Sequence, residues 1–237
     1  MRHVLWWLSA FCLLLSGCGQ GVKPAVPPEQ EMTVVTPENQ TPAWWIAYFT
    51  VDWPENTQPR FYVDDLLAHR LVEPELNRFH AAISLWRIHR RAARDEAGHR
   101  FRFIFYAPAR VAAAIFRDLQ SQPLLADLQQ AGVVKELVVD DVHGTLKTDI
   151  GATGDPIWSH DLNESWPYFA MGASQTWLSL VDRYAPSPDS VRSVPELLQE
   201  YERVDKRVTE TWQSEGGHAF LHHLNAIFGY QPLGINF

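Results

Sequence analysis

Three histidines stand close together near the end of the chain, in the segment HAFLHH that begins at His218. On a helix, His218 and His222 would be about one turn apart, so both imidazoles could reach one metal ion. The apolar residues of this segment group about 140° away on the helical wheel, so the pair points away from its own core contact. A zinc-peptidase helix carries Glu directly after the first histidine, and this chain has Ala219 there. His160, Asp161 and Glu215 are candidates for a third ligand, although the sequence does not place them beside the pair. Without one, the pair is a polar helix face, and this is the interpretation that the sequence favours.

The second group consists of four arginines: Arg87, Arg90, Arg91 and Arg94. The last three lie three, four and seven residues after the first. The predicted helix over 75–97 would place them on one stripe. Such a stripe can bind an anion, whether a lipid headgroup, a phosphate or an acidic partner. The alternative is a solvated face that pairs with acids of the same chain, such as Asp140 and Asp141.

The third group is Asp140, Asp141 and His143, which follow a predicted strand and lead into a glycine-containing loop. Sites in open α/β sheets form at the carboxyl ends of strands. Two carboxylates and an imidazole there suit metal binding or proton transfer, so these three are the catalytic candidates. Paired aspartates after a strand are also ordinary turn residues.

The chain lacks several motifs that would identify an enzyme or a nucleotide site. It has no G-x-S-x-G elbow, no P-loop, no C-x-x-C pair and no G-x-G-x-x-G fingerprint. We therefore expect no cofactor, and we favour a non-enzymatic protein. Tryptophans such as Trp44, Trp45, Trp53 and Trp158 can stack on sugars, although the spacing in 44–53 is more typical of a core strand.

Periodicity and breakers indicate the order of the elements. Predicted strands cover 44–53, 100–107 and 133–141. Predicted helices cover 63–72, 75–97, 109–120, a segment ending at Gly132, 165–184, 196–214 and 218–228. Strands that alternate with helices predict an α/β fold with a small, three- to four-stranded, mostly parallel sheet, flanking helices and a helical C-terminal third. The long segment 142–158 is predicted to be a loop of the kind that often has a function.

The N-terminus predicts export. Arg2 precedes an apolar run over 4–16, which has the length and flanks of a secretory signal and is too short to cross a bilayer. The run ends in Leu15-Ser16-Gly17-Cys18, which resembles the lipobox of bacterial lipoprotein precursors. The resemblance covers residues 1–18 and implies cleavage after Gly17 and acylation of Cys18. Since Gly19 follows the cysteine, the outer membrane is the expected location, with the domain on its periplasmic face.

The expected organisation is a signal peptide over 1–17, a lipidated cysteine with a flexible tether over 18–41, and one globular α/β domain over 42–237. The net charge of −8 becomes one unit more negative when Arg2 is removed, which argues against nucleic acid as a partner. We therefore expect a lipid-anchored protein of the bacterial cell envelope that contacts the membrane through Cys18. The expected function is that of a non-enzymatic accessory or binding module for an envelope protein or an anionic partner. The alternative is an envelope hydrolase, with or without a metal ion, that uses the loop with Asp140, Asp141 and His143.

Overall fold

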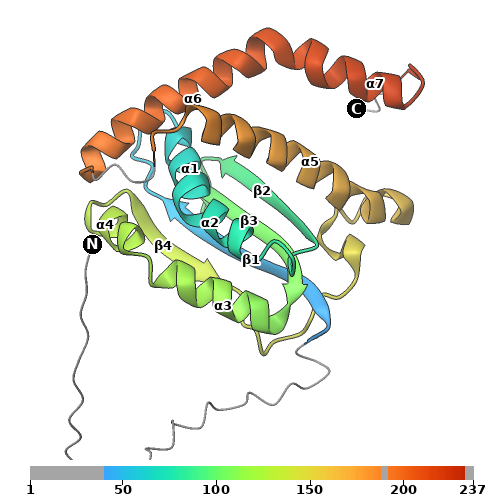
Figure 1. Ribbon diagram of the computed structural model, residues 1–237, viewed down its shortest axis with the longest axis horizontal. Coiled ribbons are helices and arrows are strands. Elements are labelled where there is room, and N and C mark those ends of the chain that lie inside the picture. The colour runs from blue at the N-terminus through green and yellow to red at the C-terminus, as the bar shows by residue number, and fades with distance from the viewer. Residues whose placement is uncertain (1–39, 188–191, 233–237) are drawn as a thin grey trace, which may run out of the picture. The chain divides into compact units, whose positions relative to one another are not determined.

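A computed structural model describes residues 40–187 and 192–232 (Figure 1). The signal sequence, Cys18 and the predicted tether up to residue 39 lie outside the described residues. Export, lipidation and tethering therefore stay predictions from the sequence.

Four strands form one sheet: β1 (Pro42–Val51), β2 (Leu85–Ala92), β3 (His99–Pro108) and β4 (Val134–Val139). Their order is β2-β3-β1-β4, and every neighbouring pair is antiparallel. The prediction of a mostly parallel sheet is therefore wrong, although the chain does combine strands with helices. The order of elements, β-α-β-β-α-β, is that of the split βαβ or ferredoxin-like motif. Such a topology does not indicate a function by itself.

The error came from β2, which lies inside the segment 75–97 that was predicted to be one helix. The helical part, α2, covers only Glu73–Arg78, and the chain then turns into the strand. β2 and β3 form a hairpin, so the strand that follows the first helices is not the neighbour of β1. Gly98 directly follows the predicted helix over 75–97, but it has a φ of +59° and closes this hairpin instead.

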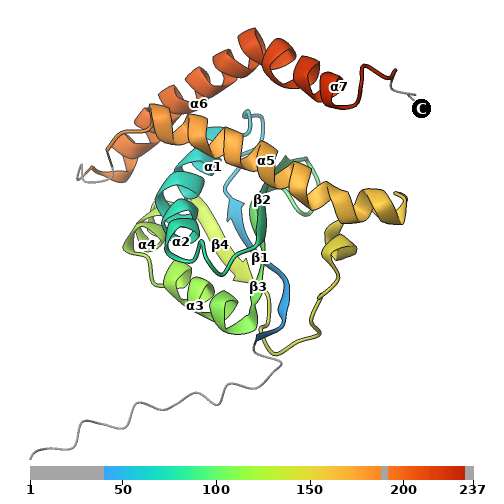
Figure 2. The ribbon, with the colours of Figure 1, turned by 45° about the vertical axis from the view of Figure 1, so that its right-hand side comes forward.

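Helices cover one face of the sheet. The inward side chains of β1 and β3, including Phe49, Phe101, Phe103 and Phe105, pack in the main core. Figure 2 shows the helices that lie on this side. They are α1 (Phe61–Leu67), continued through the π-helical turn η2 (Ala68–Val72) into α2, together with α3 (Ala109–Gln120) and α4 (Pro123–Gln130). The predicted helix over 109–120 is confirmed.

The opposite face of the sheet is covered only in part. Trp44, Leu85 and Ile104 form a small second cluster there, with Ile150 packed against it. The indole nitrogen of Trp44 donates to the backbone oxygens of Asp149 and Ile150. The long loop after β4, which contains the short 3-10 helix η3 (Ile150–Thr153), is therefore held against this face.

The C-terminal third is helical, as predicted. It consists of α5 (His160–Tyr184), α6 (Val194–Gly216), the π-helical turn η4 (Gly217–His222) and α7 (His223–Ile227). The glycine pair at 216–217 lies between the predicted helices over 196–214 and 218–228, but the backbone there is right-handed helical and the chain continues into η4. Among the helices within the described ranges, none has the length and hydropathy needed to cross a membrane.

α5 lies along the free edge of β2 (Figure 1). The hydroxyl of Ser174 accepts a hydrogen bond of 3.0 Å from the backbone nitrogen of Ile88, which would otherwise lack a partner strand. α6 then packs on α1 through Leu197, Tyr201 and Val204. The helices thereby protect an edge that would otherwise be open to pairing with another chain.

Candidate functional sites

The four arginines do not form one helical stripe, because three of them belong to β2 and Arg94 lies in the hairpin turn. Successive side chains of a strand point to opposite faces. Arg87 and Arg91 therefore lie on the partly open face, whereas Arg90 lies on the face covered by helices. Arg94 donates to three backbone oxygens of the 53–57 loop, and its guanidinium lies 3.4 Å from the ring centroid of Trp53.

Arg90 is the centre of a buried charge network. Its guanidinium lies 3.1 Å from Asp64, 3.3 Å from Asp65 and 3.4 Å from Asp205. Asp64 and Asp65 are fully buried, and His99 lies 3.0 Å from Asp64. Burial raises the pKa of Asp65 well above its ordinary value, although Arg90 opposes this shift. Because three carboxylates already surround Arg90, the network joins β2 to α1 and α6 and offers no free positive charge.

The partly open face of the sheet is basic. Arg87, His89 and Arg91 on β2 lie beside β3, where Arg91 is directly opposite Arg100 and His89 is opposite Arg102. Arg87 donates to Thr153, Arg91 pairs with Asp95, and Arg100 lies over the ring of Tyr48. Within the described residues, Arg102 makes no hydrogen bond or ion pair. The prediction of an anion-binding surface stays a prediction, and this face is where the structure gathers basic side chains.

Asp140, Asp141 and His143 do not converge. Asp140 accepts a hydrogen bond of 2.9 Å from the backbone nitrogen of Ile46, and so extends the pairing of β1 with β4. Asp141 accepts from the backbone nitrogen of His143, and its carbonyl accepts from Gly144. These contacts are the turn chemistry that was the alternative interpretation.

The histidines of HAFLHH lie on η4 and at the start of α7. The rings of His218 and His222 are stacked, with centroids 5.3 Å apart, and His223 meets both edge-on. All three are exposed. No third ligand atom joins them in the arrangement that a metal ion needs, as far as the described residues go. His160, Asp161 and Glu215 do not complete such a site.

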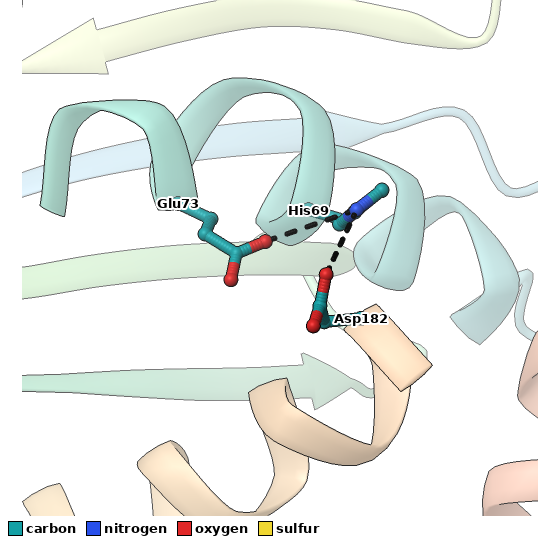
Figure 3. Close-up of side chains that lie close together, drawn as sticks. All are labelled: His69, Glu73 and Asp182. Carbon is teal, nitrogen blue, oxygen red and sulfur yellow. Dashed lines mark ion pairs between the residues drawn. The ribbon is translucent and has the colours of Figure 1, made fainter. Parts of the chain in front are cut away.

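A different cluster has that arrangement, and no sequence pattern pointed to it. His69 of η2, Glu73 of α2 and Asp182 of α5 point toward one another (Figure 3). The Nε2 atom of His69 lies 3.8 Å from Glu73 and 3.6 Å from Asp182. The three potential ligand atoms all lie within 4.8 Å of one another.

Tyr201 of α6 completes the surroundings of His69. The Nδ1 atom of His69 and the hydroxyl of Tyr201 share a hydrogen bond of 2.5 Å, and both side chains are buried. Burial lowers the pKa of His69, although Asp182 opposes this. Burial also raises the pKa of Glu73 to about 7, with a further contribution from the charge of Asp182. The cluster therefore contains a neutral imidazole between two carboxyl groups that disfavour ionising together.

Sequence spacing gave little signal for this cluster. His69 and Glu73 are four residues apart, and so are His160 and Glu164 on α5, which are both exposed. What distinguishes the first pair is the approach of Asp182 from another helix. That approach depends on how α5 packs, which no local pattern records.

The C-terminal helices enclose an open groove of about 640 Å³. One wall is α5, from Tyr168 to Leu180, and the other is α6 near Trp212 together with η4 and α7. Arg90 lies among the lining residues. Several side chains of the groove are strongly exposed: Tyr168, Phe169, Trp212, Leu221 and Ile227.

Apolar residues of α5 line this groove, and two of them, Trp177 and Leu180, also pack against the main core. Phe169, Ala173, Trp177 and Leu180 recur at helical spacing within the predicted helix over 165–184, and all four line the groove. The stripe of α6 is buried at Leu197, Tyr201, Val204 and Val208, but Trp212 is 55% exposed. Two amphipathic helices therefore diverge and leave part of their apolar surface uncovered.

No family model, curated protein sequence or solved structure matches this chain.

Proposed function

We propose that this protein is a lipid-anchored binding module of the bacterial cell envelope, and that it binds a hydrocarbon chain in the groove between α5 and the α6–α7 segment. The observation that carries the proposal is the groove itself. Its volume of about 640 Å³ lies within the range of small-molecule sites, roughly 300–1,000 Å³. Exposed apolar surface of this kind, concentrated in one concave place, is typical of a binding site.

The charges around the groove favour an uncharged ligand. Arg90, Tyr168 and His223 are the titratable groups of its lining. Arg90 is surrounded by Asp64, Asp65 and Asp205, so its positive charge is already compensated. A free carboxylate placed there would meet three acids as well as the guanidinium. An acyl chain or another apolar chain requires no such charge, and its binding is driven by removal of apolar surface from water.

The proposed location agrees with this ligand. Acylation of Cys18 would hold the domain beside a membrane, where the hydrocarbon chains of lipids and of other lipoproteins are concentrated. The anionic partner suggested by the arginines belongs to the open face with Arg102, which is separate from the groove lining. The hydrolase alternative finds no support in the loop after β4, because Asp140 and Asp141 are engaged with backbone nitrogens.

A glycine of α5 provides a direct test. A Cβ atom at Gly172 would meet nothing within 4 Å, and this residue lines the groove. Gly172→Leu should therefore fill part of the groove without a clash, and leucine also favours the helix by about 0.8 kcal/mol. Gly217 has equally open surroundings and is helical, but it is not a lining residue. Gly217→Leu is the matched control.

The experiment measures the fluorescence of N-phenyl-1-naphthylamine, an uncharged aromatic amine, on protein that lacks residues 1–18, so that no acyl group or detergent competes. We expect saturable binding to the unsubstituted protein and to Gly217→Leu. Binding to Gly172→Leu should be about tenfold weaker, equal to about 1.4 kcal/mol. The proposal fails if the unsubstituted protein shows no saturable binding, or if Gly172→Leu binds the probe as well as its control does.

A further inference from the structure

The spacing of His69, Glu73 and Asp182 is close to that around a bound metal ion. Zinc lies about 2.1 Å from nitrogen and oxygen ligands, and tetrahedral ligands are then about 3.4 Å apart. In the structure the Nε2 atom of His69 is 3.6 Å from Asp182 and 3.8 Å from Glu73. Movements of less than about 1 Å would bring these atoms to coordinating positions. The carboxylate of Asp182 has room to make them, since its side chain is 60% exposed.

His69 is held as a metal-ligating histidine usually is. Its side chain is only 4% exposed and lies at the turn η2, a π-helical segment of the kind often found at functional sites. The Nδ1 atom is engaged by Tyr201, and the Nε2 atom points between the two carboxyl groups at distances too long for hydrogen bonds. When Nδ1 carries the proton and donates to Tyr201, the lone pair of Nε2 faces two acceptors. A cation between the three groups relieves this repulsion.

We propose that His69, Glu73 and Asp182 bind a divalent transition-metal ion, with zinc as the ion to test. One imidazole with two carboxylates suits zinc and its neighbours in the first transition row, whereas calcium and magnesium prefer oxygen ligands throughout. Three protein ligands leave a fourth position for water. Tyr201 would be the positioning residue, because its hydrogen bond to Nδ1 sets the orientation of the ring.

The ion would connect two separate parts of the fold. His69 and Glu73 belong to the continuous helical segment over 61–78, and Asp182 belongs to the last turn of α5. Zinc would therefore stabilise the packing of α5, which also forms one wall of the groove. The metal site does not depend on the proposed hydrocarbon ligand, since none of its three ligands lines the groove.

The test uses the full chain, purified in detergent and freed of metal with a chelator, and follows the melting temperature as ZnCl₂ is added. A ligand that binds only the folded state raises this temperature in a concentration-dependent way. Asp182→Asn is the main variant, because the exposed side chain is replaced by one of the same shape. Glu73→Gln is the second variant. Glu164→Gln is the matched control, because Glu164 also lies four residues after a histidine, and the exposed pair it forms with His160 is not part of a three-ligand group within the described residues.

We expect zinc to raise the melting temperature of the unsubstituted protein and of Glu164→Gln, and magnesium and calcium to have no such effect. Asp182→Asn and Glu73→Gln should each bind zinc at least about tenfold more weakly, since even loss of an outer-shell partner costs that much. A double variant, His218→Gln with His222→Gln, should keep the response. The proposal is overturned if the unsubstituted protein does not respond, if Asp182→Asn and Glu73→Gln both respond fully, or if the response depends on His218 and His222.

Discussion

Arg90 and Arg91 are neighbours in the sequence, yet the structure predicts very different consequences for their removal. We consider Arg90→Met and Arg91→Met, which both keep an unbranched side chain and remove the charge. Arg90 faces the helices and contacts two fully buried carboxylates. Arg91 faces the other side of the sheet and pairs with the exposed Asp95. If the four arginines formed one helical stripe, the two substitutions would be equivalent.

The size of the effect at Arg90 follows from what the substitution leaves behind. Asp64 and Asp65 would remain buried, and of the ion pairs among the described residues Asp64 would keep the one with His99 alone. Removing one partner of a buried ion pair costs about 3–5 kcal/mol, because the remaining charge is neither hydrated nor paired. The contacts of the guanidinium with the rings of Phe61 and Trp177 would also be lost. Arg91→Met should change the stability very little, since exposed pairs contribute little.

Urea denaturation of the two purified variants measures this difference. With a slope of about 2 kcal/mol per molar urea, a loss of 3–5 kcal/mol lowers the midpoint by about 2 M. The midpoint of Arg91→Met should stay near that of the unsubstituted protein. The deficit of Arg90→Met should also shrink toward pH 4, because protonation of the stranded carboxyl groups removes their charge. Equal midpoints for the two variants at pH 7 would refute the strand assignment and the buried network together.

Three further predictions concern other parts of the chain. Cys18→Ser should prevent acylation and release the protein from membranes or leave an uncleaved precursor, and absence of palmitate incorporation into the unsubstituted protein would contradict the lipoprotein assignment. Folding raises the pKa of Glu73 from 4.5 to about 7. The stability that the protonated carboxyl contributes is therefore complete below pH 4.5 and is lost as the pH rises through 7. In the presence of a chelator, Glu73→Gln should therefore be more stable than the unsubstituted protein at pH 8, by about 1–2 kcal/mol. This is less than the full pKa shift implies, because the carboxyl is partly exposed. Calorimetry at pH 4.5 and at pH 8 checks this. Gly98→Ala should cost about 1 kcal/mol in urea denaturation, because an alanine at a φ of +59° is strained although its Cβ has open space.

The segment 75–97 was predicted as a helix because a buried charge disrupts the alternating pattern of the strand within it. In β2 the inward positions are Trp86, Ile88 and Arg90, so a charged residue stands where an apolar one is expected. On the other face, Leu85 is buried beneath the loop around Ile150. Both exceptions destroy the alternation that identifies a half-buried strand. The same apolar residues, counted with nearby alanines, then fit a helical arc.

The sequence also contained only part of the information about the site residues. For His69, the sequence contained the residue and its neighbour at Glu73, but the partners that give the site its character are distant. Tyr201 is 132 residues away along the chain, and Asp182 belongs to a different helix. The groove could also be predicted in part. The amphipathic helix over 165–184 was predicted, but its position beside the α6–α7 segment was not.

The sequence by itself determined the features that depend on short stretches of chain. The strands around 44–53, 100–107 and 133–141 and the helical C-terminal third follow from local composition and periodicity, and they are present in the structure. The export signal with Cys18 rests on the same kind of local pattern and stays a prediction. The tertiary structure decided the direction of the strands, the partners of each arginine, and the convergence of His69, Glu73 and Asp182. The physical reason is that periodicity records which face of an element is apolar, whereas pairing and convergence depend on the packing of whole elements against one another.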